Sequence, residues 1–293
     1  MGGFPIAGVR VGHATRGGSG CTVVLFRAGT VGAVDVRGGA PATREIDLLD
    51  PLRTVARIDA IVFSGGSAFG LAAADGVMRY LAARGQGYAT AGGVVPIVPS
   101  ACIFDLPESG GATPGADDGE AAAVAAARDE PVAVGRVGAG RAATVGKWKG
   151  RDHAVPGGVG CASAMVGDAH IAALAVVNAV GDVIAADGSV IAGSTAPEGA
   201  EAFPTPTPFE EQPDRENTTL VAIVTDAICD KTACALIAQS AHDGFARALS
   251  PAHTRFDGDL AIAAATGAVE AHLDRLRIAA AEVTAEAIRQ APR

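Results

Sequence analysis

Aromatic side chains are scarce in this chain. Phe, Tyr and Trp make up 4% of its 293 residues, although 49% of all residues are hydrophobic. The core must therefore be built from Ala, Val and Gly, which suits closely packed layers of sheet and helix. Positive charge is also in deficit, because 23 Lys and Arg stand against 32 Asp and Glu, a formal net charge of −9. A nucleic acid partner is not expected for so acidic a chain.

Sequence patterns typical of metal sites, disulfide frameworks or membrane spans are missing too. The five cysteines are an odd number without a CxxC, so no disulfide framework is expected and a reducing cytoplasm fits. The six histidines form no i,i+4 pair and have no Cys or carboxylate at ligand spacing, so neither a metal nor a cofactor is predicted. The N-terminus has no basic region followed by an apolar one, so no secretory signal is visible. The longest apolar run, Ile171 to Ala186, is interrupted by Asn178 and is too short to span a bilayer, so no membrane is expected.

The apolar pattern predicts a layered α+β fold. Strands are predicted at 21–26, 32–36, 60–63, 94–98 and 219–225, and Gly-broken strands between 144 and 186. Helices are predicted at 67–83, 117–129, 231–248 and 267–290. Residues 194–216 form the clearest linker, because five prolines forbid regular structure there. The strand beyond the linker is too apolar to stand alone, so the whole chain, 1–293, is expected to form a single domain.

The junction Asn217-Thr218 lies where the linker meets an apolar, β-branched run, Leu220 to Thr225. A flexible segment thus delivers a hydroxyl residue to the start of a buried strand. That layout is the one an N-terminal nucleophile enzyme requires, in which the chain is cut before the nucleophile and the freed amine becomes its base. An ordinary loop-to-strand junction has the same local sequence, since Asn favours turns.

Four other polar residues are candidates for the same chemistry. Lys147 and Asn178 each interrupt an apolar run, and a buried Asn must hydrogen-bond its amide to backbone or to a ligand. Asp257 and Asp259 flank Gly258, so both face one side if the segment is extended. Each residue also has a simpler interpretation. Lys147 could be a solvated lysine at a sheet edge, Asn178 a hydrogen-bonding residue of the core, and Asp257 and Asp259 parts of a polar loop.

The run Ser64 to Gly70 follows a predicted strand and opens a predicted helix. It lacks the spacing of the known phosphate-binding loops, and Phe69 stands where a nucleophile elbow needs its second Gly. A tight strand-to-helix turn capped by Ser67 is therefore expected.

Taken in order, these residues resemble one family, that of the DmpA-type aminopeptidases, the β-peptidyl aminopeptidases and the nylon-oligomer hydrolases. The resemblance runs through nearly the whole chain. It is carried by the runs 8–15, 20–23, 37–45, 64–71, 143–147, 177–178, 217–220 and 256–259.

The resemblance implies a four-layer αββα sandwich, no cofactor or metal, and autoproteolysis between Asn217 and Thr218 into chains 1–217 and 218–293. It implies Thr218 as the nucleophile, and a homo-oligomer, often a tetramer, acting on a small amide or peptide. The family's supporting groups correspond to Lys147, Asn178, Asp257 and Asp259. Thr at the cleavage site and the Asp pair point to the nylon-hydrolase branch, because the aminopeptidase branch has Ser at the former and Ser with Glu at the latter.

One departure from the family concerns specificity. The aminopeptidases resemble one another in a Glu that holds the substrate amine, whereas the matching stretch, Pro99 to Phe104, contains no carboxylate before Asp105. Aminopeptidase specificity is therefore in question, while amide hydrolysis is still expected. Two other functions stay open: acyl transfer of the ornithine acetyltransferase type, and ligand binding without catalysis.

Overall fold

Two five-stranded sheets form the centre of the protein in the computed structural model, which describes residues 4–204 and 217–292. The first sheet has the order β1-β2-β5-β8-β4, and only its β5–β8 pair is parallel. Its strands are β1 (Arg10–Arg16), β2 (Ser19–Leu25), β4 (Ala42–Arg44), β5 (Ala60–Ser64) and β8 (Ser100–Cys102).

The second sheet has the order β11-β12-β15-β17-β3, and its single parallel pair is β15–β17. Its strands are β3 (Val31–Val36), β11 (Gly158–Val166), β12 (Ala169–Asn178), β15 (Thr218–Ala227) and β17 (Leu260–Val269). Strand β15, which follows the linker, thus lies in the middle of the sheet and pairs on both sides.

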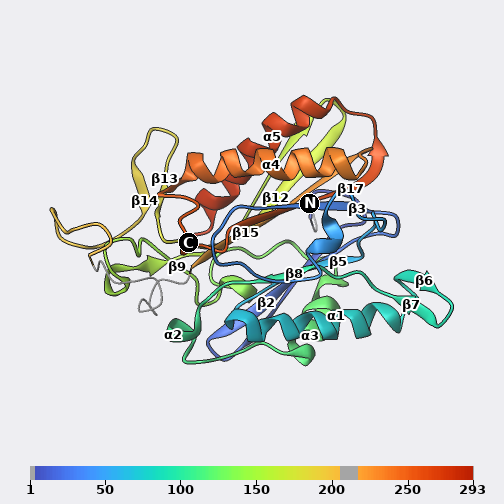
Figure 1. The fold of residues 1–293 in the computed structure, drawn as a ribbon, viewed down its shortest axis with the longest axis horizontal. Coiled ribbons are helices and arrows are strands. Elements are labelled where there is room, and N and C mark those ends of the chain that lie inside the picture. The colour runs from blue at the N-terminus through green and yellow to red at the C-terminus, as the bar shows by residue number, and fades with distance from the viewer. Residues whose placement is uncertain (1–3, 205–216, 293) are drawn as a thin grey trace.

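Helices cover the outer face of each sheet (Figure 1). The first sheet carries α1 (Ala73–Ala82) and α3 (Ala116–Ala126), and the second carries α4 (Lys231–Ala248) and α5 (Leu273–Gln290). The layers follow the order helix, sheet, sheet, helix, so the predicted αββα sandwich is confirmed.

Small side chains allow these layers to approach closely. Along β15, Leu220, Ala222 and Val224 enter the core between the sheets, while Val221 and Ile223 join the core under α4 and α5. Because both faces are buried, the strand reads as one continuous apolar run. Helix α5 approaches β11 so closely that a methyl group on Gly160 would lie 1.9 Å from the carbonyl oxygen of Ala287.

The remaining elements are short. They are β6 (Tyr88–Thr90), β7 (Gly93–Val95), β9 (Thr144–Val145), β10 (Val155–Pro156), β13 (Asp182–Ile184), β14 (Val190–Ala192), β16 (Leu249–Ser250), α2 (Leu106–Ser109), and the 3₁₀ turns η1 (Asp47–Leu49), η2 (Ser67–Ala72), η3 (Gly138–Gly140) and η4 (Arg151–His153). Among the described residues, no helix combines the length and apolar character needed to cross a bilayer.

Two sequence predictions about strands are wrong. The predicted strand at 94–98 is a strand only as far as Val95, within an exposed hairpin of β6 and β7. Strand β17 is absent from the prediction because its sequence is rich in Ala, which favours helix. The last helix consequently begins at Leu273 instead of residue 267.

The turn after β5 also differs from expectation. The predicted helix 67–83 begins as the 3₁₀ turn η2 and becomes α-helical only at Ala73. Gly66 is the N-cap residue of η2, and Ser67 is the first residue inside the turn, so the predicted capping role of Ser67 is wrong. Its left-handed backbone, with φ 55°, takes it out of the extended conformation that an N-cap residue adopts.

Candidate active site

The Asn217–Thr218 peptide bond is buried at the start of β15. Thr218 is the first residue of that strand and pairs with Asn178, the last residue of β12. The Thr218 hydroxyl donates a hydrogen bond to the carbonyl oxygen of Asn217, the residue before it. The same carbonyl oxygen accepts the backbone N–H of Gly258 across 2.8 Å. The Thr218 hydroxyl and the Gly258 N–H therefore both contact the carbonyl whose peptide bond would break if the chain were cut before Thr218.

Gly258 leaves room for this meeting. A methyl group at this position would lie 2.7 Å from Thr218 Oγ1 and 2.8 Å from the carbonyl oxygen of Ala40. Both contacts are closer than real side-chain carbons come, so this position has space for glycine alone.

The run at 37–45 holds the segment around Gly258 in place. The N–H groups of Arg37 and Gly38 both donate to the carbonyl oxygen of Asp259 at 3.0 Å, and that of Ala40 donates to the Asp257 carbonyl at 3.0 Å. This run therefore serves the site through its backbone.

Lys147 lies directly after β9 and is buried, with 8% of its surface exposed. Its ammonium group donates to Thr144 Oγ1 at 3.1 Å, to Asn178 Oδ1 at 2.9 Å and to the Asn178 carbonyl at 3.2 Å. An ammonium group has three N–H donors, so all three have acceptors. The reading of Lys147 as a solvated edge residue is therefore wrong. Burial, and next the charge of Arg151, lower the pKa of Lys147 to about 7.

The Asn178 amide is fully buried and connects three segments. Its Oδ1 accepts from Lys147 and from the backbone N–H of Thr144 at 3.0 Å, and its Nδ2 donates to the Phe104 carbonyl at 2.9 Å. The expectation that this amide must find a partner is confirmed. One of its two N–H donors is committed to Phe104, which leaves the second as the candidate donor to a substrate.

Asp105 secures the stretch that carries the Phe104 carbonyl. Its carboxylate accepts from Ser19 Oγ at 2.7 Å and from the Gly66 N–H at 2.6 Å. Burial raises the pKa of Asp105. Through this Gly66 contact, the run at 64–70 helps to fix Phe104 next to Asn178.

Asp257 and Asp259 are both buried, 2% and 1% exposed. Asp257 accepts the N–H of Val180 at 3.2 Å, and Asp259 accepts the N–H of Thr219 at 2.7 Å. The two carboxylates thus hold the backbone of Val180, just beyond the end of β12, and of Thr219, the residue after Thr218. Burial, and then the charge of Asp259, raise the pKa of Asp257.

A charged pair lies within electrostatic reach of Lys147. Arg151 binds Glu108 through two bonds of 2.9 Å, and their side chains are 16% and 20% exposed. The Arg151 guanidinium also lies over the ring of Phe104, 5.6 Å from its centre.

Sequence reasoning missed several of the residues assembled around Thr218. The sequence could have indicated Gly258, which lies between two Asp residues, and Thr144, which lies three residues before Lys147. The carbonyl of Phe104 had no such signal, because a backbone group leaves no mark on the side-chain pattern. The linker prediction falls partly on residues 205–216, which lie outside the described residues.

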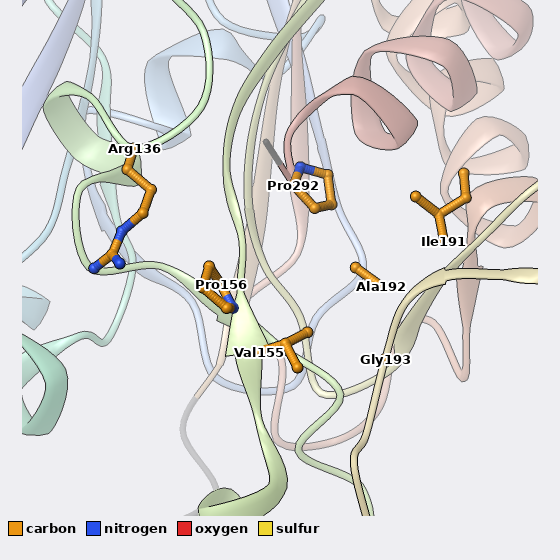
Figure 2. A pocket seen from close by; sticks show the side chains of 7 residues that line it. All are labelled: Arg136, Val155, Pro156, Ile191, Ala192, Gly193 and Pro292. Carbon is orange, nitrogen blue, oxygen red and sulfur yellow. The ribbon is translucent and has the colours of Figure 1, made fainter.

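A separate pocket of about 470 Å³ opens beside β10 and β14. Figure 2 shows the Arg136 side chain on one side of Pro156, with Ile191 and Ala192 on the other. Gly193 in its wall packs behind Gly146, the residue before Lys147. The pocket is mostly apolar and none of the residues around Thr218 lines it.

Within the described residues, no group of three or more His, Cys, Asp or Glu side chains is arranged to hold a metal ion. The chemistry assembled at Thr218 consists of one hydroxyl, one buried ammonium, one amide, two carboxylates and one backbone N–H. These are the parts of an acyl-transfer site: a nucleophile, donors for an oxyanion and groups that orient them.

Comparison with known proteins gives a consistent result. Residues 5–291 match the profile of Peptidase family S58. An uncharacterized aminopeptidase of Mycobacterium tuberculosis is 45% identical over 298 residues, covering 90% of this chain and 81% of the relative. A 6-aminohexanoate-oligomer endohydrolase of Agromyces sp. is 32% identical over 279 residues, covering 91% of this chain and 75% of the relative.

Solved structures share the fold. The β-aminopeptidase of Burkholderia sp. superposes with a TM-score of 0.74 at 23% identity, covering 99% of this chain and 87% of that one. The L-aminopeptidase D-Ala-esterase/amidase of Ochrobactrum anthropi, described as a variant of the Ntn hydrolase fold, gives 0.71 at 19% identity, covering 98% and 84%.

Proposed function

The chain belongs to Peptidase family S58, and on that premise we propose that it is a self-processing N-terminal nucleophile hydrolase of amides with Thr218 as its nucleophile. The observation that carries the proposal is the Asn217 carbonyl, which receives both the Thr218 hydroxyl and the Gly258 N–H. The Thr218 hydroxyl, a common nucleophile in hydrolases, thus lies against the Asn217–Thr218 peptide bond, whose carbonyl oxygen already accepts a hydrogen bond from Gly258.

Processing begins with attack of Thr218 Oγ on the Asn217 carbonyl carbon. The bond from that carbon to the Thr218 nitrogen breaks, and the hydroxyl proton passes to the leaving nitrogen, which becomes an amine. The resulting ester is then cleaved by water, which leaves a carboxylate on Asn217 and restores the Thr218 hydroxyl. The Gly258 N–H, 2.8 Å from the carbonyl oxygen, stabilises the negative charge that develops there; losing one such donor typically costs on the order of 10²–10³ in rate.

The mature enzyme repeats this chemistry on a substrate. A free α-amine ordinarily has a pKa of roughly 7.7–8.0, so the amine released at Thr218 can act as general base near neutral pH. When Lys147 is protonated, its positive charge favours the neutral form of that amine. Departure of the Asn217 carbonyl leaves the Gly258 N–H available to the substrate oxyanion, next to the second N–H of Asn178.

The two fragments, 1–217 and 218–293, are proposed to remain one catalytic domain. Strand β15 of the second fragment pairs with β12 of the first and with β17 of the second. Separation would expose Leu220 and Val224 together with the core between the sheets, which strongly opposes it.

The substrate is proposed to be a short peptide or oligoamide. This class covers what the relatives' names state, aminopeptidase in one case and 6-aminohexanoate-oligomer endohydrolase in the other. A cytoplasmic homo-oligomer, a tetramer by resemblance, that needs no metal or cofactor is part of the same proposal. Light scattering on the purified protein tests the assembly.

Intact mass of the purified protein tests the cleavage. The wild-type chain should yield a fragment from Thr218 to Arg293, and Thr218→Ala should stay whole. The matched control is Thr219→Ala, because Thr219 is equally buried and its hydroxyl has no partner in the described part of the chain. This control should be cut as the wild type is, and should hydrolyse 6-aminohexanoate oligomers or dipeptide amides. Cleavage elsewhere, or an active uncut chain, contradicts the proposal.

A further inference from the structure

A row of side chains leads away from Asp259 into the protein. Asp259 Oδ2 lies 2.9 Å from His253 Nδ1, and His253 Nε2 lies 3.2 Å from His242 Nδ1. His242 Nε2 lies 3.1 Å from the carbonyl oxygen of Asp35 in β3. The side chains of Asp259, His253 and His242 are 2%, 20% and 0% exposed. The row therefore runs from the edge of the proposed site, through His242 of α4, to β3, the edge strand that pairs with β17.

Protons can be counted along this row from its inner end. A carbonyl oxygen can only accept, so His242 Nε2 must carry a hydrogen. Burial lowers the pKa of His242 to about 4, so the ring is neutral and its Nδ1 is an acceptor. His253 Nε2 must then donate to it. The last contact, between His253 Nδ1 and Asp259, requires one further proton on either the ring or the carboxyl group.

The surroundings of Asp259 place that proton on the ring. Oδ1 of Asp259 accepts the N–H of Thr219 at 2.7 Å. Oδ2 accepts the backbone N–H of His253 at 3.2 Å in addition to the ring contact. Hydrogen bonds donated to a carboxyl group favour its charged form. With Asp259 as a carboxylate, both nitrogens of His253 carry hydrogens, and the ring is an imidazolium.

We propose that His253 is a positioning residue that keeps a positive charge against Asp259 and so holds Asp259 as a carboxylate. Two buried carboxylates as close as Asp257 and Asp259 oppose each other's ionisation, and a cation beside one of them offsets the effect. Asp259 then keeps the hydrogen bond that it accepts from the N–H of Thr219, the residue after the proposed nucleophile. The link to catalysis rests on the function proposed above.

Among the described residues, charged groups also face the two ends of this row. Asp257 lies beside Asp259 and within electrostatic reach of the Lys147 ammonium, and Asp35 lies with its partner Arg37 beside His242. The Asp35 carboxylate is 3.6 Å from His242 Nε2 and already binds Arg37 at 2.9 Å. The charges of Asp35 and Arg37 balance each other, so the positive charge of His253 acts mainly on Asp259 and Asp257.

The variant that separates charge from hydrogen bonding is His253→Asn. Its amide can donate to Asp259 from nearly the position of Nδ1 but cannot carry a proton charge, and Asn tolerates the left-handed backbone of residue 253, φ 52°. The matched control is His170→Asn. His170 also contacts a carboxylate, that of Asp226 at 3.0 Å, but at the opposite end of β12 from Asn178.

The first measurement is the pH profile of kcat on an amide substrate. In His253→Asn the acid limb should move to higher pH by about one unit or more, the usual effect of one nearby opposite charge. His170→Asn should leave it in place. An acid limb that stays where it is in His253→Asn, with kcat retained, overturns the proposal.

The second measurement does not depend on activity or on any change at His253. In the uncut Thr218→Ala chain labelled with ¹⁵N-histidine, NMR at neutral pH should show both ring nitrogens of His253 protonated. His242 should appear as a neutral ring with its hydrogen on Nε2. A neutral His253 ring overturns the proposal even if His253→Asn fails to fold. Failure of the proposed function would appear separately, as a wild-type chain that neither cuts itself nor hydrolyses amides.

Discussion

The backbone N–H of Gly258 donates to the carbonyl oxygen of Asn217 across 2.8 Å, from a segment about forty residues further along the chain. The contact forms because Asn217 runs parallel to Asp257 just before β15 and β17 pair. A donor is thus fixed on the carbonyl of the proposed cleavage site before any bond changes, which is the arrangement that lowers the barrier to acyl transfer.

Gly258→Ala should therefore block processing. The new methyl group would lie 2.7 Å from Thr218 Oγ1, so either the hydroxyl or the Gly258 segment must move away from the Asn217 carbonyl. We expect the processing rate, followed by intact mass after cell-free synthesis, to fall at least about a hundredfold, as for loss of an oxyanion donor.

The control for that substitution is Gly92→Ala, where the nearest atom to an added methyl is Thr90 Oγ1 at 3.8 Å. It should be cut normally. Normal cutting of a folded Gly258→Ala chain would remove Gly258 from the mechanism.

Lys147→Met should stop processing without lowering stability at neutral pH. Because burial lowers the pKa of Lys147 to about 7, the unfolded chain holds this proton more tightly than the folded one between about pH 7 and 10. Stability therefore rises with pH across that window, by at most about 1.4 kcal/mol per unit. The variant lacks this contribution.

The measurement compares the Tm of Thr218→Ala with that of Thr218→Ala carrying Lys147→Met, so that neither chain is cut. Any advantage of the Met variant should be largest at pH 7 and below and should shrink as the pH rises towards 10. A difference that is constant with pH would show that Lys147 does not lose its proton in that window.

Asn178→Ala should impair both chemistry and stability. The substitution removes the amide that binds Lys147, Thr144 and Phe104. We expect processing to slow by about 10²–10³, and the uncut Thr218→Ala background to lose about 1–3 kcal/mol of stability from buried groups left without partners. Thr144→Val, which keeps the amide, should slow processing less. A chain that melts earlier but processes at the normal rate would make Asn178 a core hydrogen-bonder only.

Hydrolysis should not require a free amine on the substrate. The carboxylates near Lys147 are engaged: Asp105 by Ser19 and Gly66, and Glu108 by Arg151. A substrate ammonium must lose water without gaining an available counter-charge, which is unfavourable. Oligomers with acylated and free N-termini should thus be cut at similar kcat/KM.

A preference for free amines of a hundredfold, roughly 2.7 kcal/mol, would contradict this specificity. Glu108→Gln then identifies the cause: loss of the preference in that variant would show that Glu108 leaves Arg151 to bind the substrate amine.

The fold was predictable where one physical signal dominated. Strand β15 and helix α4 follow from unbroken apolar and amphipathic patterns, and α4 occupies the predicted range, Lys231 to Ala248. Strand β17 was not predictable, because its alanines favour helix and only burial on both faces makes them a strand. The apolar residues of 94–98 predict one strand, whereas the strand in the structure, β7, ends at Val95 in a hairpin near the surface.

The candidate site was predictable in its side chains but not in its connections. Thr218, Lys147 and Asn178 stand out as polar residues in or beside apolar runs, whereas the backbone groups of Phe104 and Gly258 leave no such mark. His242 lies in α4 and His253 in the loop after β16, eleven residues further on, so no spacing rule connects them. The chain brings the two rings together only by turning back through β16.

Under the proposed processing, the central position of β15 also determines when the chain can be cut. Thr218 reaches the Asn217 carbonyl, and Gly258 reaches it from the other side, only after β15 has taken its place between β12 and β17. Those pairings join segments far apart along the sequence and form late in assembly. A nascent or misfolded chain lacks the geometry to break its own backbone. The fraction of chains cut between Asn217 and Thr218 in a preparation therefore measures the fraction of molecules that have completed folding.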